Sequence, residues 1–500
     1  MSALRQMPHW LLYHARTTPE TIALEYRDHT WTYQQLASEV VELAKVLSVR
    51  GIEHGTRVAV ISGNHPIQVK VFHALILLGA VMIPVNHRLS PREMEWHLDN
   101  AGCQYLCIQD SYRDAISEGV LPGEIITLSN CETTNRTSKK STLVLKRFQP
   151  DEICGIFYTS GTTGNPKGAI LTYSNFFMST MASAINLGSS VNDRWLACLP
   201  LDHIGGFSIL MRSVIYGTTM VLEPEFDPGE IQKQLRENAI TVASLVPTML
   251  HRLLQHDTSG WHTLRALLLG GGPAPTSLIQ AAMECKLPLL RTYGMTETCS
   301  QVATIPLQES SPPVESSGKV LPFTTVQIIH DDGTRCQPGE PGEIVIQGPT
   351  VMEGYWRNPR VTNQTIVQGW LHTGDFGYLD ADQFIYVVAR RDDLISTGGE
   401  NVYPEEVERV LKSHPGIRDA GIVGIDDPQW GQVVSAAVVL DPESDLDENS
   451  LRRLQFDSLA SYKHPKQYVI VDSLPKTSLG KLERDTLRSI IDPRLKNTGE

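Results

Sequence analysis

The sequence contains no run of about 18 consecutive apolar residues, the length that would cross a bilayer as a helix. The first twenty residues, MSALRQMPHWLLYHARTTPE, include an apolar run too short for a secretory signal peptide, and charged residues soon follow it. These absences predict a soluble, cytoplasmic protein without an integral membrane segment.

An excess of positive charge is also missing. The chain has 43 Lys and Arg against 56 Asp and Glu, a formal net charge of −13 at pH 7. This balance argues against nucleic acid or an anionic membrane as the main partner, so a local site must hold any anionic ligand. The eight cysteines include no CxxC pair, and Cys103 and Cys107 have no second pair at zinc-finger spacing. We therefore expect reduced, mostly buried thiols.

With 500 residues the chain is too long for one compact core, so at least two folding units are expected. Leu36, Val40, Leu43 and Leu47 recur at helical spacing, and a short apolar run follows at residues 57–62. The same pattern repeats in PIQVKVFHALILLG and AVMIPV, with Gly79 at the join. Alternating helices and buried strands predict an α/β sheet covered on both faces.

Two later regions have a different character. Residues 316–348 contain short strands separated by Gly and Pro, which predicts a small β unit. After Arg390 the segment YPEEVERVLKSHPGIRDAGIVGI reads as a proline-started helix and a strand. We expect a large α/β domain at residues 1–390 and a small α+β domain at 391–500, joined by a short, stiff, charged hinge. The polar stretch at residues 129–141 is expected to be a surface loop.

The loop in FYTSGTTGNPKGAIL is unusually rich in glycine and hydroxyl groups. It follows the apolar run ICGIFY, so it emerges at the carboxyl end of a buried strand, where α/β sheets bind ligands. Backbone N–H groups, the hydroxyls of Ser160, Thr162 and Thr163, and the Lys167 ammonium suit a phosphate group. The spacing differs from that of the P-loop.

Five motifs together resemble those of the adenylate-forming enzymes, the superfamily of acyl-CoA synthetases, luciferases and peptide-synthetase adenylation domains. In chain order they are YTSGTTGNPKG (158–168), YGMTET (293–298), LHTGDFGYLD (371–380), ARRDDLISTGGENVYPEEVE (389–408) and PKTSLGKLERDTLR (475–488). The resemblance covers essentially the whole chain. It implies ATP and Mg²⁺ as cofactors and a mobile small domain that carries a catalytic lysine.

The resemblance also implies roles for individual residues. Lys481 would stabilise the transition state at the α-phosphate, Glu297 would bind Mg²⁺, and Thr296 would bind phosphate. Asp375 would accept hydrogen bonds from the ribose hydroxyls with help from Arg390, and Tyr293 would stack near adenine. The remaining nucleotide-binding candidates are Thr159, Ser160, Gly161, Thr162, Thr163, Gly164, Lys167, Gly271 and Gly272.

The acceptor of the acyl group is expected to be coenzyme A, because the twelve residues after Arg488 are too few for the carrier domain of a peptide-synthetase module. In the family the small domain rotates after adenylate formation, here about Asp392, and brings residues 396–401 beside a pantetheine tunnel. Ala389 replaces the usual glycine of the hinge motif. Ser396 stands where many relatives have lysine, which puts a second-step role of that position in doubt.

The acid is indicated by residues 199–222 and 267–301, which resemble the o-succinylbenzoate–CoA ligases of menaquinone biosynthesis. This substrate carries two carboxylates, so Arg212 is a candidate partner for the one that is not activated. His203 is expected between the substrate carboxylate and the thiol path as a candidate catalytic residue, with Gly270 and Ser300 beside the acyl group. Asp202 and Gly205 depart from that pattern, in which an aromatic residue and a serine are usual.

Three other hypotheses remain open at this point. The chain could be a ligase for another aryl or medium-chain acid, a catalytically dead homologue that only binds nucleotide, or a luciferase-like oxygenase, for which the sequence offers nothing. Partners other than the acid, ATP and coenzyme A are not indicated, and whether the chain forms a homo-oligomer is left open.

Overall fold

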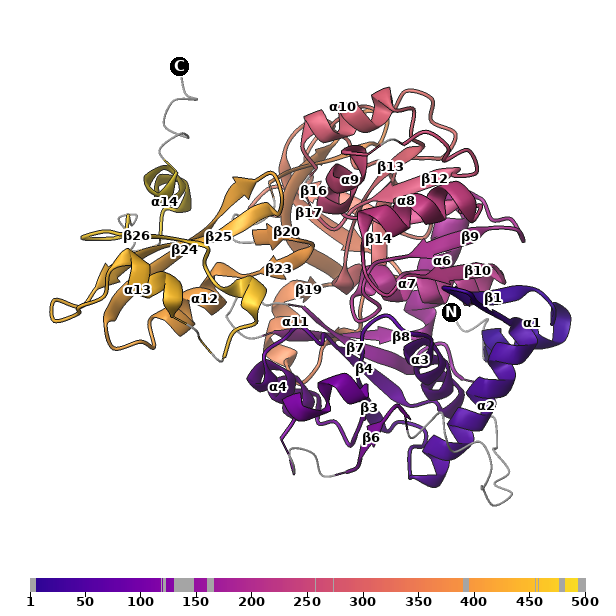
Figure 1. Cartoon of the computed structure of the whole chain (residues 1–500). Helices are drawn as coiled ribbons and strands as arrows, with labels where there is room; N and C mark the ends of the chain where they lie inside the picture. Colours follow the sequence, from indigo (N-terminus) through magenta and orange to yellow (C-terminus); the bar gives the residue numbers. More distant parts are fainter. Residues whose placement is uncertain are drawn as a thin grey trace. The chain divides into compact units, whose positions relative to one another are not determined.

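A computed structural model of the chain describes residues 6–117, 119, 123–129, 148–159, 166–256, 258–272, 274–389, 395–454, 456, 458–475 and 482–492. The chain divides into two compact units (Figure 1). The larger one contains Met1–His87, Glu95–Tyr158 and Gly168–Val388, and the second contains Arg88–Met94, Thr159–Lys167 and Ala389–Glu500. The expected fold class, a large α/β part with a small β unit followed by a small α+β part, is confirmed.

The described strands of the larger unit form three sheets. The first has the order β18-β8-β7-β4-β3-β5-β6, with β3 (Arg57–Ile61), β4 (Val81–Val85), β5 (Tyr105–Ile108), β6 (Ile125–Thr127), β7 (Ile153–Thr159), β8 (Lys167–Thr172) and β18 (Gly354–Tyr355). The second has the order β15-β14-β13-β12-β11-β9-β10-β1-β2, with β1 (Ile22–Tyr26), β2 (His29–Thr32), β9 (Arg194–Ala197), β10 (Thr219–Leu222), β11 (Val242–Leu245), β12 (Ala266–Leu269), β13 (Leu289–Met295), β14 (Ser300–Thr304) and β15 (Lys319–Val320).

The third sheet is the small β unit expected from the Gly- and Pro-rich region. Its order is β16-β17-β20-β19, with β21 beside β20, and the strands are β16 (Thr325–Ile329), β17 (Gly342–Gln347), β19 (Ile366–Val367), β20 (Trp370–Leu379) and β21 (Ile385–Ala389). The predicted β region ended at residue 348, but the sheet continues to β21, because β20 closes it by pairing with β17.

Local signals mark the ends of two helices that the sequence predicted, α2 (Tyr33–Val49) and α3 (Pro66–Leu78). The other described helices of the larger unit are α1 (Trp10–Thr17), α4 (Pro91–Ala101), α6 (Tyr173–Leu187), α7 (Ile204–Tyr216), α8 (Pro228–Glu237), α9 (Pro247–Leu254), α10 (Thr276–Glu284) and α11 (Pro359–Thr365). Thr32 and Gln35 form a capping box at α2, and Gly79 ends α3 in the left-handed region with a φ of 67°. No described helix is long and apolar enough to cross a membrane.

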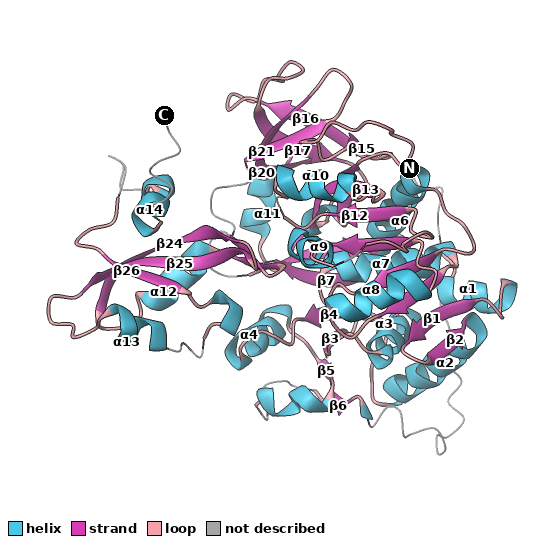
Figure 2. Ribbon diagram, turned by 45° about the horizontal axis from the view of Figure 1, so that its top comes forward, coloured by secondary structure: helices cyan, strands magenta, loops and turns pink. Residues whose placement is uncertain are grey.

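Two apolar clusters hold these layers together. One joins β-strands of the second sheet to α8, α9 and α10, which lie along one face of it (Figure 2), and includes Leu196, Ile231, Leu250, Leu267 and Leu278. In the other, the Phe207 ring of α7 lies 4.9–5.2 Å, centroid to centroid, from the rings of Phe72, Phe157 and Phe176. These three rings come from α3, β7 and α6, so α7 is fixed on several sides.

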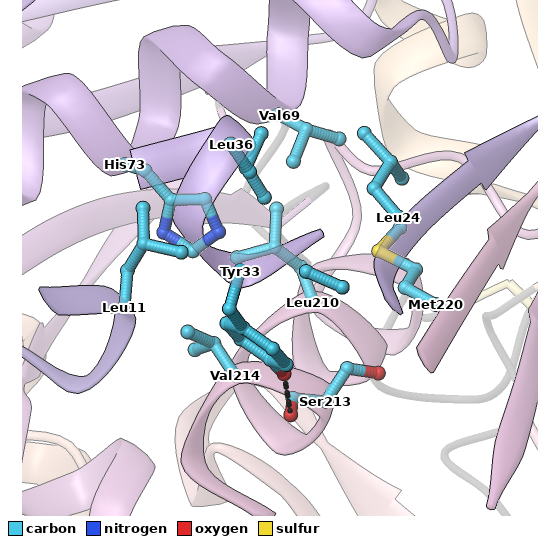
Figure 3. Close-up of a pocket in the computed structure, with 11 residues that line it drawn as sticks. Leu11, Leu24, Tyr33, Leu36, Val69, His73, Leu210, Ser213, Val214 and Met220 are labelled. Atoms are coloured by element: carbon cyan, nitrogen blue, oxygen red, sulfur yellow. Dashed lines mark hydrogen bonds between the residues drawn. The ribbon is translucent and has the colours of Figure 1, made fainter. Parts of the chain in front are cut away.

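A small cavity of about 10 Å³ lies at another part of this core, among residues of α1, α2, α3, α7, β1 and β10 (Figure 3). Tyr33 points into it and donates its hydroxyl hydrogen bond to a backbone oxygen of α7, Ser213 O at 3.0 Å, with Thr218 O at 2.8 Å. His73 lies at the cavity wall and is 5% exposed. The lining is otherwise largely apolar, which makes the cavity a packing feature of the core.

The second unit has a sheet of its own, ordered β23-β22-β25-β24 with β26 beside β25. Its elements are β22 (Ile395–Thr397), β23 (Glu400–Val402), α12 (Pro404–Leu411), β24 (Ile417–Asp427), β25 (Gly431–Leu440), α13 (Glu448–Arg453), β26 (Gln467–Ile470) and α14 (Arg484–Ile491). Val407 and Leu411 of α12 are fully buried against this sheet. The loop predicted at residues 129–141 lies outside the described residues beyond Ser129.

Candidate active site

The hairpin between β13 and β14 gathers several predicted site residues in one tight turn. A short 3₁₀ turn at Thr296–Thr298 reverses the chain, and the Thr298 hydroxyl donates to Met295 O at 3.0 Å. Cys299 and Ser300 follow with φ values of 51° and 90°, a conformation that costs energy for residues with a Cβ. The surrounding structure holds it: the Ser179 hydroxyl donates to Cys299 O at 2.7 Å. Thr296, Glu297 and Ser300 are therefore displayed by a fixed turn.

Glu297 is held by a residue that no motif identified. The Tyr355 hydroxyl, from β18, donates to Glu297 Oε1 at 2.8 Å, and the Met352 amide donates to the Glu297 carbonyl at 2.9 Å. Among the described residues, Oε2 has no hydrogen-bond partner. A half-buried carboxylate with one oxygen oriented by a neighbour and the other available suits a hard cation such as Mg²⁺.

Asp375 lies in β20 and is 5% exposed. The Tyr293 hydroxyl donates to Asp375 Oδ2 at 2.7 Å, so the second and third motifs meet at this carboxylate. The Thr373 hydroxyl accepts from the Asp375 amide at 2.9 Å, and Glu343 Oε1 accepts from the Gly374 amide at 3.1 Å. Backbone and side chain of Asp375 are thus both fixed before any ligand binds.

Arg212 is a buried cation, and the part of the chain that the structure describes gives it no ion-pair partner. It lies in α7, is 3% exposed, and donates through Nη2 to the Ser300 hydroxyl at 3.3 Å. Its guanidinium carbon lies 5.6 Å from the centre of the Trp195 ring, and Nε has no hydrogen-bond partner among the described residues. Burial lowers the pKa of Arg212 from its ordinary value, and the nearby groups that raise it are Tyr216 and Cys299. A buried guanidinium in such surroundings would gain from an anion.

His203 lies directly before α7. Its Nε2 is 3.2 Å from Asn86 Nδ2, so this ring nitrogen accepts when the amide donates. Asp202 beside it is buried, 9% exposed. A Cβ on Gly205 would be 3.5 Å from the nearest atom, in Leu199, so the backbone leaves room for a Cβ there. A Cβ on Gly206 would be 2.1 Å from Pro200 O, which makes glycine necessary at that position.

The three glycines at 270–272 follow β12, next to the end of β13 that carries Tyr293. A Cβ on Gly270 would be 2.7 Å from Thr292 Cγ2, and Gly271 has a φ of 81°. These restrictions keep backbone exposed at the carboxyl ends of two parallel strands, a common place for ligands.

Other predicted residues belong to the second unit or are not described. Ser160, Gly161, Thr162, Thr163, Gly164, Arg390, Asp392 and Lys481 lie outside the described residues. Thr159 ends β7 and Lys167 begins β8, and the Thr159 hydroxyl donates to Lys167 O at 3.4 Å. Residues 396–401 form the end of the β22–β23 hairpin, with Gly398 and Gly399 in its turn at φ values of 59° and 85°.

Sequence reasoning missed Tyr355, Glu343 and Asn86. They lie 58, 31 and 117 residues from the partners Glu297, Gly374 and His203. No local periodicity or motif could have connected them, because only the tertiary fold brings these pairs together.

The chain is similar to known proteins over nearly its whole length. The family described as AMP-binding enzyme matches residues 11–356, and the AMP-binding enzyme C-terminal domain matches residues 406–481. A 2–succinylbenzoate–CoA ligase from Bacillus licheniformis is 41% identical over 484 residues, covering 97% of this chain and 100% of that protein.

Solved structures agree over nearly the full length. A double mutant of o-succinylbenzoate CoA synthetase from Bacillus subtilis, bound with its product analogue OSB-NCoA, has a TM-score of 0.92 and 38% identity, covering 97% of this chain and 99% of that one. The enzyme from the same organism in complex with ATP and magnesium ion has a TM-score of 0.75 and 37% identity, covering 97% of this chain and all of that one.

Proposed function

The chain belongs to the AMP-binding enzyme family, and from that premise we propose that it is an o-succinylbenzoate–CoA ligase. It forms an acyl-adenylate from the acid and ATP, releasing pyrophosphate, and then transfers the acyl group to coenzyme A, releasing AMP. ATP and coenzyme A are its co-substrates and Mg²⁺ its metal ion, in line with the relatives it matches. The product belongs to menaquinone biosynthesis.

In the first step one carboxylate oxygen of the acid attacks the α-phosphorus of ATP, and the bond to pyrophosphate breaks. Asp375 would accept the ribose hydroxyls, with Tyr293 and Thr373 holding it in position. Glu297 would hold Mg²⁺ through the oxygen that Tyr355 leaves available, which offsets repulsion between anionic reactants. We assign Lys481 to the developing charge at the α-phosphate. Thr296 and residues 159–167 would hold the departing phosphates.

In the second step the thiol of coenzyme A loses its proton to solvent, its sulfur attacks the acyl carbonyl carbon, and the bond from that carbon to AMP breaks. We propose that residues 391–500 rotate relative to residues 1–390 about Asp392 between the steps, which removes Lys481 and brings in residues 396–401. The positive φ values of Gly398 and Gly399 favour glycine at both positions of that turn. His203 would lie on the thiol path. Because its co-substrates are ATP and coenzyme A, we propose that the enzyme acts in the cytoplasm.

The observation that carries the choice of acid is the buried guanidinium of Arg212. Neither of the groups that raise its pKa, Tyr216 and Cys299, is a carboxylic acid. The second carboxylate of o-succinylbenzoate would supply the missing anion, with the Ser300 hydroxyl 3.3 Å from Nη2 as a further donor. An acid with a single carboxylate would leave this buried charge unpaired.

The test is exchange of labelled pyrophosphate into ATP, measured with the purified chain over a panel of acids. We expect exchange with o-succinylbenzoate and at least roughly 100-fold less with benzoate or octanoate at equal concentration, because one desolvated ion pair contributes a few kcal/mol. Exchange with benzoate or octanoate but not with o-succinylbenzoate would overturn the choice of acid and leave the adenylation chemistry intact. No exchange with any acid would favour a catalytically dead homologue.

A further inference from the structure

A mixed group of metal-binding side chains lies in the connection between β16 and β17, in the small β unit. His330, Cys336 and Glu340 each offer one ligand atom, and these atoms all lie within 4.8 Å of one another. His330 Nε2 is 3.4 Å from Glu340 Oε1. The adenylation chemistry uses none of the three. From this arrangement we propose that they bind one divalent metal ion of the zinc class.

The donor set favours that class of ion. A thiolate, an imidazole and a carboxylate are the three protein ligands that zinc accepts, whereas Mg²⁺ and Ca²⁺ prefer oxygen atoms alone. With bond lengths of about 2.0–2.3 Å, a tetrahedral ion places its ligands roughly 3.3–3.8 Å apart. The His330–Glu340 separation already fits this range, and the longest separation must close by about 1 Å. Side-chain torsions are sufficient for that change.

The backbone around the three ligands is already fixed. The Cys336 amide donates to Ile328 O at 2.9 Å, the His330 amide to Thr334 O at 2.9 Å, and the Gly339 amide to Leu379 O at 2.7 Å. The connection is thus tied to β16, to itself and to the end of β20. Because this backbone is already ordered, less entropy is lost when the three side chains bind an ion, which favours binding.

Glu340 shows the orientation expected of a metal-binding carboxylate. Its Oε2 accepts from the Gln337 amide at 2.9 Å, which turns Oε1 toward His330. Such an outer hydrogen bond commonly positions a ligand on a metal ion. Cys336 is 7% exposed, while the side chains of His330 and Glu340 are 39% and 44% exposed, so an ion can enter from their side.

Binding would replace the Cys336 thiol proton, which passes to solvent, and form one bond each to Sγ, Nε2 and Oε1, with water in the fourth position. The thiol now donates to Pro341 O at 3.8 Å, a weak contact that is lost on metallation. The ion would tie β16 to the start of β17, which pairs with the strand that carries Asp375. Its role would be structural support of that strand pair.

The test uses the full chain stripped of metal by a chelator and then loaded with Zn²⁺ or Co²⁺ in the absence of ATP. We expect one zinc per chain by elemental analysis, and a thiolate-to-cobalt charge-transfer band with Co²⁺. Cys336→Ser should abolish the band and weaken zinc binding more than roughly 100-fold, because it removes a direct ligand. Cys285→Ser, at the exposed free cysteine, is the matched control and should retain both.

His330→Gln and Glu340→Gln keep the proposal testable if Cys336→Ser does not fold, because both side chains are partly exposed. Each should weaken zinc binding at least roughly tenfold and remove the rise in melting temperature that zinc gives the wild-type chain. The proposal is overturned if the wild-type chain binds no zinc at micromolar concentration. It is equally overturned if binding survives His330→Gln and Glu340→Gln unchanged, or if Cys285→Ser abolishes the cobalt band.

Discussion

Asp375 and Arg212 are both buried charged side chains, but they have different hydrogen-bond partners. Asp375 has a neutral donor, the Tyr293 hydroxyl, at 2.7 Å, which orients the carboxylate without neutralising it. Tyr293→Phe should therefore leave the fold intact and raise the KM for ATP about tenfold with a smaller change in kcat, since a hydrogen bond to a charged group contributes about 1.5–3 kcal/mol. Steady-state kinetics with ATP varied measures this. Tyr378→Phe, on the same strand, is the control, and an equal effect there would contradict the positioning role.

Arg212 donates to the Ser300 hydroxyl but has no carboxylate partner among the described residues, so its substitution should act on the acid and not on the nucleotide. We expect Arg212→Met to lower kcat/KM for o-succinylbenzoate about 100-fold, because the second carboxylate loses its ion pair, while the KM for ATP stays within about twofold. Arg212→Lys keeps the charge and should retain more activity, though less than wild type, because a lysine cannot form the two-pronged contact of a guanidinium. Equal losses for the two variants, or a parallel rise in the KM for ATP, would speak against a substrate contact.

At the scale of elements, the β13–β14 hairpin depends on one glycine. A Cβ on Gly294 would be 1.8 Å from Ser300 O, a backbone atom, so Gly294→Ala must displace the turn that carries Glu297 and Ser300. Activity should fall by more than roughly 100-fold, because misplacement by about 1 Å at an active site has effects of that size. Gly205→Ala is the matched control, with 3.5 Å to the nearest atom. Adenylation assays on both soluble proteins should separate them, and similar activity would refute this explanation.

The start of α14 is a second element whose placement matters, because it follows Lys481 by three residues. Arg484 Nη1 donates to Glu408 Oε1 at 2.7 Å and to Ile422 O at 2.7 Å, which ties α14 to α12 and β24. Arg484→Met leaves the buried Glu408 carboxylate without its cation, a change that typically costs about 3–5 kcal/mol. We expect faster amide hydrogen exchange in α14 and slower adenylation.

The companion variants for this ion pair distinguish lost charge from lost packing. Glu408→Gln combined with Arg484→Met should restore part of the protection from exchange, because no buried charge then lacks a partner. Arg452→Met, at an exposed position of α13, should exchange like wild type. If the double variant is no better protected than Arg484→Met alone, the ion pair is not what fixes α14.

Elements and motifs were predictable from sequence because their signals are local. The periodicity of Leu36, Val40, Leu43 and Leu47 and the glycine at 79 correctly predicted α2 and the end of α3. The Tyr355–Glu297 and Tyr293–Asp375 contacts were not predictable, since each joins residues 58 or 82 positions apart through the packing of different strands. The extent of the small β unit was underestimated for the same reason: β20 pairs with β17, and even the nearest pair, Ile346 and Leu371, has 24 residues between its members.

At the scale of the whole molecule, burial of one imidazole links stability of the fold to pH. His73 lies in α3 at the wall of the internal cavity (Figure 3), and burial lowers its pKa to about 4 from an ordinary value of 6.5. Between these two values the unfolded chain binds the proton and the folded chain does not. The free energy of unfolding is therefore unaffected by His73 above pH 6.5, and the part that depends on its neutral form is lost progressively as pH falls toward 4.

This linkage gives a prediction for the melting temperature. Lowering the pH from 7.5 to 5 should reduce stability by about 2 kcal/mol through His73 alone, or roughly 2–3 °C for a unit of this size. His73→Leu removes the titrating group, so its melting temperature should fall less than that of wild type over the same interval, whatever its value at pH 7.5. His262→Gln, at an exposed histidine, should match wild type. If His73→Leu loses as many degrees as wild type, His73 is protonated in the folded chain and the linkage is absent.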